Sequence, residues 1–191
     1  MTSRNNRMSA HMRREQVLSV ALSIFAEKGY AATGTSEIAE RAGISQPYVI
    51  RLFGRKRDLF LAVVDRAWDR LEGSLLDRAA AQAGAEQGQS SELQPTALAA
   101  VLSECEELSV LSQGFAANFD PVIREAVRNR FGRFYEVAHS LVDKQAIEVA
   151  DHFIADGILL TAMAALQLVG PHAHPTPWSR ELLDDLRNNG R

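Results

Sequence analysis

Apolar residues recur at three- and four-residue spacing along almost the whole of this chain, and no stretch alternates convincingly with a period of two. The first spacing lines up apolar side chains along one face of a helix, whereas a half-buried strand requires alternation. This pattern constrains the fold more than any other feature. It predicts an all-α protein of about nine helices.

Four helices are expected in the first 84 residues. The first runs from Arg13 to Lys28-Gly29, where a cation in the last turn is followed by a glycine C-cap. A short second helix begins with Thr35 as its N-cap and ends at Gly43. The other two are expected from Ser45, as N-cap, to about Phe53, and from about Lys56 to near Gly84.

Residues 84–94 have the composition of a loop or linker, and only helical patterns follow them. The expected stripes are Leu98 to Leu108, Val122 to Val142 after the helix-opening Asp120-Pro121, Ala146 to Val169, and Trp178 to about Asn188. The segment from Gly157 to Val169 is apolar nearly all round, but its 13 residues fall short of the roughly 20 that cross a bilayer. We therefore expect a soluble protein with no membrane partner.

The formal net charge of -3 hides an uneven distribution along the chain. Residues 1–70 hold 12 Lys and Arg against 7 Asp and Glu, which gives +5. Residues 71–191 hold 9 against 17, which gives -8. A basic N-terminal third joined to an acidic remainder is expected when one domain meets phosphate and the other does not.

Several function classes find little support in the sequence. The single cysteine, Cys105, cannot form an intramolecular disulfide, and no signal peptide is apparent, so a cytoplasmic location is expected. His172 and His174 lie in a proline-rich loop without a carboxylate or cysteine at ligand spacing, so no metal site is expected. Without a nucleophile-base pair or a Gly-rich phosphate loop, we expect neither a cofactor nor an enzyme.

The two short helices joined at Gly43 are predicted to form a helix-turn-helix, in which the second helix enters the major groove of DNA. Packing of its apolar residues leaves Ser45, Gln46, Tyr48 and Arg51 on the outer face of that helix. Gln46 and Arg51 carry donors suited to adenine and guanine edges, and Tyr48 can reach a phosphate or a thymine methyl. These residues are the predicted DNA-reading surface.

The stretch from Arg13 to about Leu71 resembles the DNA-binding domain of TetR-type transcriptional regulators. The matching elements are Ala21, Phe25, Gly29-Tyr30, Thr35, Ile38-Ala39, Ala42-Gly43-Ile44-Ser45, Phe53, Lys56 and Leu59. The chain departs from the family at Ile50, where many members carry a tyrosine, and Tyr48 stands two residues earlier.

Residues 1–12 are polar and show no periodicity, so a flexible tail is expected there. The resemblance implies a helix-turn-helix domain over residues 13–58 and a C-terminal effector-binding and dimerisation domain over residues 59–191. The long fourth helix would join the two domains. The implied function is a transcriptional regulator, most often a repressor, which binds a palindromic double-stranded DNA operator as a homodimer and is released by a small-molecule effector. A transcriptional activator or a ligand-independent DNA binder are the alternatives, and an all-α enzyme is the runner-up outside DNA binding.

Further site residues follow from the same resemblance. Thr35 and Lys56 are implied to contact phosphates, and Arg55 and Arg57, which flank Lys56, are expected to add positive charge for the DNA backbone. An interface between two copies is expected on Ala146 to Val169 and the last helix, with Trp178 and Leu182 as candidate anchors, because a helix that is apolar all round needs neighbours on every side. The candidate effector-binding residues are Phe115, Phe119, Phe134, Tyr135, His139 and Asp156.

Overall fold

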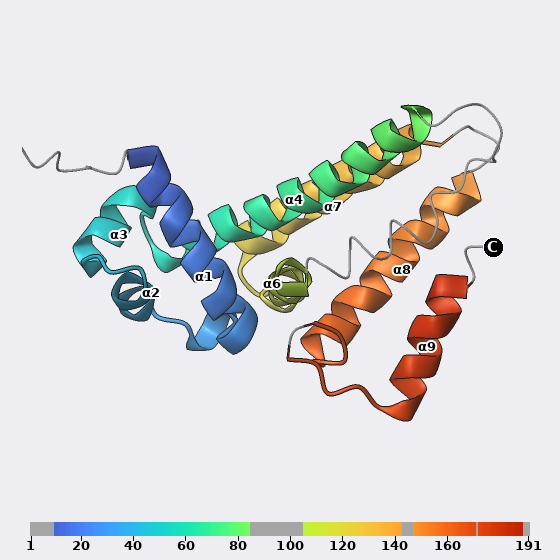
Figure 1. The fold of residues 1–191 in the computed structure, drawn as a ribbon. Coiled ribbons are helices and arrows are strands. Elements are labelled where there is room, and N and C mark those ends of the chain that lie inside the picture. Colours follow the sequence, from blue (N-terminus) through green and yellow to red (C-terminus); the bar gives the residue numbers. More distant parts are fainter. Residues whose placement is uncertain (1–9, 85–104, 143–146, 171, 189–191) are drawn as a thin grey trace, which may run out of the picture.

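The computed structural model describes residues 10–84, 105–142, 147–170 and 172–188, and these residues form helices and connecting turns without a strand (Figure 1). The helices are α1 (Ala10–Ala32), α2 (Thr35–Arg41), α3 (Gln46–Phe53), α4 (Lys56–Gly84), α6 (Cys105–Ala116), α7 (Pro121–Ser140), α8 (Ile147–Ala165) and α9 (Pro177–Asn188). The predicted all-α class is confirmed. The expectations for residues 1–9, 85–104 and 146 lie outside the described residues.

Most helix ends in the N-terminal module agree with the sequence pattern. Helix α1 begins at Ala10, so residues 10–12, which were expected in the tail, are helical. Its regular winding stops at Gly29, where φ is 78° and ψ is 169°, and the chain then adds a short turn up to Ala32. A glycine at this position avoids the steric cost that a side chain meets at positive φ.

The two predicted N-caps of the short helices have different outcomes. Thr35 is not the N-cap of α2 but its first helical residue, and Gly34 takes the cap position. Ser45 is the N-cap of α3, as predicted, although its hydroxyl makes no capping hydrogen bond. The Thr35 hydroxyl instead accepts a hydrogen bond from Gln46 at the start of α3, 2.9 Å away, so it links the two helices.

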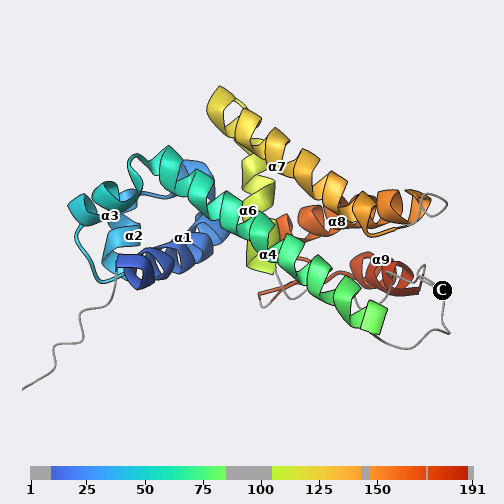
Figure 2. The same cartoon turned by 90° about the horizontal axis from the view of Figure 1, so that it is seen from above.

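Helix α4 runs from the N-terminal module into the remainder of the molecule (Figures 1 and 2). Its first turn is stabilised by Asp58, whose carboxylate accepts the backbone N–H of Arg55 at 2.9 Å, as one half of a capping box. Phe60, Val63 and Ala67 on one side of α4 are completely buried. Because α4 contributes to both ends of a continuous hydrophobic core, its position affects both.

Helices α6, α7, α8 and α9 make up the body of the molecule, and α6 lies at its centre against α1, α4 and α8 (Figure 2). The predicted opening of α7 is confirmed: the Asp120 carboxylate accepts the backbone N–H groups of Val122 and Ile123 at 2.9 and 3.4 Å. Arg130 of α7 lies 2.6 Å from the carboxylate of Asp69 and 3.1 Å from that of Asp65, which ties α7 to α4.

Two features of the body differ from the sequence pattern. The stripe expected to end at Leu108 continues as helix α6 as far as Ala116. Helix α8 is apolar nearly all round in its second half, yet Ile158 is 49% exposed, and Leu166 just beyond it is 66% exposed. Within the described residues, none of the helices combines the length and the apolar character that a membrane span requires.

Candidate DNA interface and effector cavity

The turn between α2 and α3 is short and is defined by backbone hydrogen bonds. The Gly43 N–H donates to the carbonyl of Glu40 at 3.0 Å, and the Ile44 N–H donates to that of Ala39 at 2.9 Å. Gly43 has a φ of 65°, in the left-handed region that glycine adopts at little cost. The turn therefore joins α2 and α3 by the short, glycine-containing connection that is typical of a helix-turn-helix.

Helix α1 supports the back of α3 through polar contacts. The Gln16 amide donates to the carbonyl of Ala42 at 3.3 Å, at the end of α2. The Arg14 guanidinium donates to the carbonyl of Leu52 at 3.4 Å and lies 4.3 Å from the ring centroid of Phe53. Both contacts reach backbone or ring atoms at the edges of the motif, so they attach α1 to the end of α2 and to the end of α3.

The predicted DNA-reading residues lie on one open face of α3. Ser45, Gln46 and Arg51 are exposed and Tyr48 is half-buried, whereas Val49 on the inner face is 1% exposed. The structure therefore brings these four predicted side chains together. The Thr35 hydroxyl lies next to them, because it accepts a hydrogen bond from Gln46. The hydroxyl proton of Thr35 remains available to a phosphate oxygen.

Arg51 is held by a contact that the sequence analysis missed. Its guanidinium carbon lies 4.6 Å from the ring centroid of Tyr48, one turn earlier on the same face. Such a cation–π contact orients the guanidinium without occupying its five N–H donors. The three-residue spacing of Tyr48 and Arg51 on one helix was the feature of the sequence that could have indicated this contact. Within the described residues, neither Arg51 nor Arg55 pairs with a carboxylate, so both charges are available to an anion.

Lys56 and Arg57 differ in their surroundings. The Lys56 ammonium donates to the carbonyl of Ala31 at 3.0 Å and lies 4.8 Å from the ring centroid of Tyr30, and burial lowers the pKa of this lysine. Arg57, expected beside Lys56 as additional backbone-binding charge, instead forms an ion pair with Asp120 at 3.4 Å. This pair joins the start of α4 to the start of α7, and no local pattern in the sequence indicates it.

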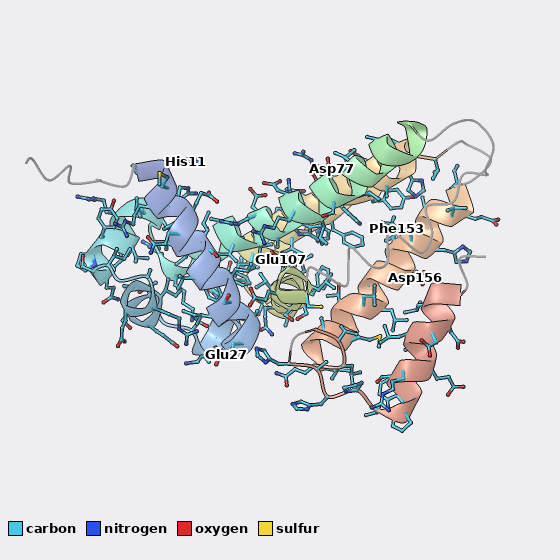
Figure 3. All side chains as sticks on the ribbon, viewed as in Figure 1. His11, Glu27, Asp77, Glu107, Phe153 and Asp156 are labelled. Atoms are coloured by element: carbon cyan, nitrogen blue, oxygen red, sulfur yellow. The ribbon has the colours of Figure 1, made fainter. Side chains whose placement is uncertain are left out.

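The body contains an apolar cavity between α4, α6, α7 and α8, with a volume of about 40 Å³. The residues around it are Trp68, Leu71, Ser74, Leu75, Leu108, Leu111, Phe115, Phe131, Phe134, Phe153, Ile154, Gly157, Ile158 and Thr161. Phe115 and Phe134, two of the predicted effector-binding residues, are among them. Phe153 extends from α8 toward Phe134, with ring centroids 6.3 Å apart (Figure 3).

The other four predicted effector-binding residues lie outside this cavity. Phe119 is 73% exposed on the turn after α6. Tyr135 stacks against His139 with ring centroids 4.1 Å apart, and His139 lies 2.9 Å from the carboxylate of Asp151 on α8. Asp156 is half-buried, and burial raises its pKa more than the nearby His152 lowers it. Helical spacing alone does not show which face of α7 or α8 turns toward the cavity.

Trp68 and Phe131 are the cavity residues that the sequence analysis missed most clearly. Trp68 lies on the apolar stripe of α4, and its ring centroid is 6.0 Å from that of Phe131 and 5.2 Å from that of Phe134. The only feature of the sequence that could have indicated them is that each belongs to an apolar stripe, Trp68 to one helix and Phe131 to another.

In the part of the chain that the structure describes, no cluster of three or more His, Cys, Asp or Glu side chains could hold a metal ion.

Sequence comparisons identify relatives of the N-terminal module. Residues 17–63 match the family model described as bacterial regulatory proteins of the tetR family. Over 68 residues the chain is 44% identical to the HTH-type transcriptional activator FasR of Mycolicibacterium smegmatis, a match that covers 36% of this chain and 31% of that protein. The chain therefore matches less than a third of this relative's length.

Comparisons of structure extend over nearly the whole chain. A putative TetR-family transcriptional regulator from Mesorhizobium loti superposes with a TM-score of 0.66 and 19% identity, covering 96% of each chain. A putative transcriptional regulator from Saccharomonospora viridis, solved in complex with choline, superposes with a TM-score of 0.58 and 20% identity. That match covers 92% of this chain and 96% of the other. These likenesses establish the fold of the body as well as that of the N-terminal module.

Proposed function

Since the chain carries the DNA-binding domain of the TetR family of bacterial regulatory proteins, we propose that it binds a palindromic operator as a homodimer and leaves it when a small molecule occupies the body. The observation that carries this proposal is the open face of α3. There Gln46 and Arg51 point away from the core, beside basic residues without carboxylate partners in the described chain. Arg and Gln are the side chains that read guanine and adenine edges in the major groove.

A homodimer is the arrangement that suits the exposed apolar side chains on and next to α8 and α9. Ile147 at the start of α8 is 44% exposed, and Leu166 just after the end of α8 is 66% exposed. Trp178 at the start of α9 is 54% exposed. A twofold axis through this region would place two α3 helices on successive major grooves, roughly 34 to 36 Å apart.

The size of the cavity favours a coupling between ligand binding and shape. Its volume is about 40 Å³, whereas pockets for small ligands usually measure roughly 300 to 1,000 Å³. An effector would therefore have to displace the aromatic side chains around the cavity. Trp68 and Leu71 belong to α4, so this displacement would move the helix that also carries Lys56. A ligand that binds the displaced state better shifts the population away from the DNA-binding state.

The Arg57–Asp120 ion pair is the contact that we propose transmits this change. Asp120 caps α7, which contributes Phe131 and Phe134 to the cavity, and Arg57 follows directly after Lys56. Movement of α7 would therefore act on the first turn of α4. The complex of the Saccharomonospora viridis protein with choline supports the general idea that this fold can hold a small molecule.

The proposal is tested by selecting bound sequences from a random DNA library and measuring the affinity of the purified protein for the selected site. A palindromic consensus with half-sites about one helical turn apart is expected. A sequence-independent affinity would contradict the proposal.

The similarity of the N-terminal module to a named transcriptional activator makes activation the second candidate. A reporter gene behind the selected operator distinguishes the two, because its transcription falls for a repressor and rises for an activator.

A further inference from the structure

We propose that the groove beside the cavity, between α6, α7 and α8, binds the head group of an amphipathic carboxylate whose apolar part enters the cavity. This inference rests on the proposed function only for its regulatory consequence, since binding itself is measurable without DNA. The residues of the groove are Gly114, Phe115, Asn118, Arg124, Val127, Arg128, Phe131 and Ile158, and its volume is about 510 Å³. That volume lies within the usual range for small-ligand pockets.

The groove and the cavity share a wall. Phe115, Phe131 and Ile158 are in contact with both spaces. The rings of Phe115 and Phe131 are nearly perpendicular, at 74°, with centroids 6.2 Å apart, and the indole of Trp68 lies behind Phe131 on the cavity side. Rotation of one phenylalanine would therefore join the two spaces and provide the volume that the closed cavity lacks.

The charges at the groove are all positive. Arg124 donates to the backbone carbonyl of Asn118 at 2.9 Å, and within the described residues it has no carboxylate partner. Arg128 pairs with Glu125 at 3.2 Å, but both side chains are more than half exposed, and an exposed pair of this kind contributes little. No carboxylate belongs to the groove itself. Charge complementarity therefore favours an anion, and disfavours a cation, at this position.

The ligand class follows from the combination of the two surfaces. A carboxylate can accept two parallel hydrogen bonds from one guanidinium, which gives both strength and orientation. The walls beyond the arginines are aromatic and aliphatic, so they match an alkyl or aryl group. A carboxylate that draws Arg124 away from the Asn118 carbonyl also acts close to Asp120, which is paired with Arg57.

The test uses the full-length protein and three probes with the same ten-carbon chain, measured by isothermal titration calorimetry. Decanoate is expected to bind more tightly than 1-decanol by at least about tenfold, because hydrogen bonds to charged groups are stronger than those between neutral groups. Decyltrimethylammonium is expected to bind more weakly than either. Equal affinities for the three probes, or a preference for the cation, would overturn the proposal.

Variants then locate the head group. The double variant Arg124→Ala/Arg128→Ala is expected to reduce the affinity for decanoate at least about tenfold and to leave that for 1-decanol unchanged. Arg124→Lys/Arg128→Lys keeps both charges and should restore most of the affinity. Arg180→Ala, which removes an exposed arginine on α9, is the matched control. If the double alanine variant, with unchanged circular dichroism, binds decanoate as well as the original protein, the head group is not in this groove.

Operator release is measured separately, so that the two proposals can fail independently. If decanoate binds through the arginines but does not release the operator, the groove is a ligand site and the effector mechanism proposed above is wrong. If decanoate releases DNA from the double alanine variant as effectively as from the original protein, the arginine groove is not the effector site and this inference is overturned.

Discussion

At the scale of single residues, the proposed DNA-reading surface contains side chains that are held in place before any DNA binds. Gln46 is bonded to Thr35, and Arg51 lies over the ring of Tyr48. Both contacts leave most of the hydrogen-bonding groups of Gln46 and Arg51 unused. Restricting rotamers in the free protein lowers the entropic cost of binding, so we propose that Tyr48 contributes to recognition through Arg51 even where it does not itself reach a base.

Replacing Arg51 by alanine should weaken binding to the selected operator by roughly 1 to 3 kcal/mol, because a bidentate contact to a guanine edge is lost. Binding to random DNA should change much less. Fluorescence anisotropy with both DNAs measures the difference. Tyr48→Phe keeps the ring under Arg51 and is the matched control for the cation–π contact. An equal loss on both DNAs would identify Arg51 as a phosphate contact only.

At Gly54 the backbone conformation and a neighbouring carboxylate both disfavour a side chain. Its φ is 86°, and a Cβ atom built there would lie 2.7 Å from a carboxylate oxygen of Asp58, which caps α4. Gly54→Ala is therefore expected to lower the free energy of unfolding by about 1 to 3 kcal/mol. Gly73→Ala, in the middle of α4 with open space around its Cβ, should instead raise it by about 0.4 to 1 kcal/mol. Urea denaturation of both variants is the measurement.

Asp156 should make the stability depend on pH in an identifiable direction. Because burial raises its pKa above the ordinary 3.8, the folded protein holds this proton more tightly than the unfolded chain does. The contribution of Asp156 to stability is therefore present at low pH and is lost as the pH rises through the folded pKa. Asp156→Asn should raise the melting temperature at pH 7 and have little effect near pH 3.5. A melting temperature that falls at pH 7 would contradict this.

At the scale of elements, the start of α7 is both a helix cap and a contact with α4. The Asp120 carboxylate accepts two backbone N–H groups of α7 and one N–H of Arg57. Although burial opposes ionisation, these hydrogen bonds and the charge of Arg57 lower the pKa of Asp120 overall. Its stabilising contribution is therefore complete above the ordinary pKa of 3.8 and is lost as the pH falls below it toward the folded value.

Asp120→Asn separates the two roles, because asparagine remains a good N-cap but carries no charge. The variant should keep α7 folded and lose the ion pair with Arg57. We expect near-normal operator affinity without ligand and a weaker reduction of that affinity by an effector. Glu136→Gln, which makes the same carboxylate-to-amide change at an exposed position of α7, is the control. Unchanged effector-induced release in Asp120→Asn would exclude the Arg57–Asp120 pair as the transmitting contact.

At the scale of the whole molecule, the continuous core joins the DNA-facing end to the body. The same helix, α4, supports α3 at its first turns and the cavity at its middle. A movement of one end of α4 therefore requires the side chains around its other end to repack, because protein interiors are close-packed. The two ends of α4 can therefore influence each other through the packing of this one helix, without a chain of side-chain contacts between α3 and the cavity.

Assembly is tested by placing a charge on the proposed dimer surface. Trp178→Glu should shift the protein from dimer to monomer in analytical ultracentrifugation and reduce operator affinity, because an unpaired carboxylate in an apolar interface is costly. Phe119→Glu changes an even more exposed aromatic residue on the turn before α7 and should leave the dimer intact. A Trp178→Glu protein that remains dimeric would place the interface elsewhere.

The sequence predicted much of the local structure. The ends of α3 at Phe53 and of α4 at Lys56 and Gly84 agree with the pattern, as does the cap at Asp120. The predicted N-cap of α2, Thr35, is one residue later than the observed cap, Gly34. Threonine and glycine are both acceptable caps, and residue preferences alone do not choose between adjacent positions.

What the amino-acid sequence determined by itself is the helical class, most helix ends and the exposed face of α3, since these follow from 3.6-residue periodicity and local capping chemistry. Only the tertiary structure decided which aromatic residues surround the cavity, that Arg57 turns to Asp120, and that Arg124 and Arg128 border an apolar groove. Each of these depends on how helices that are distant in sequence cross and rotate against one another. Those angles result from the packing of the whole core, which no short stretch of sequence contains.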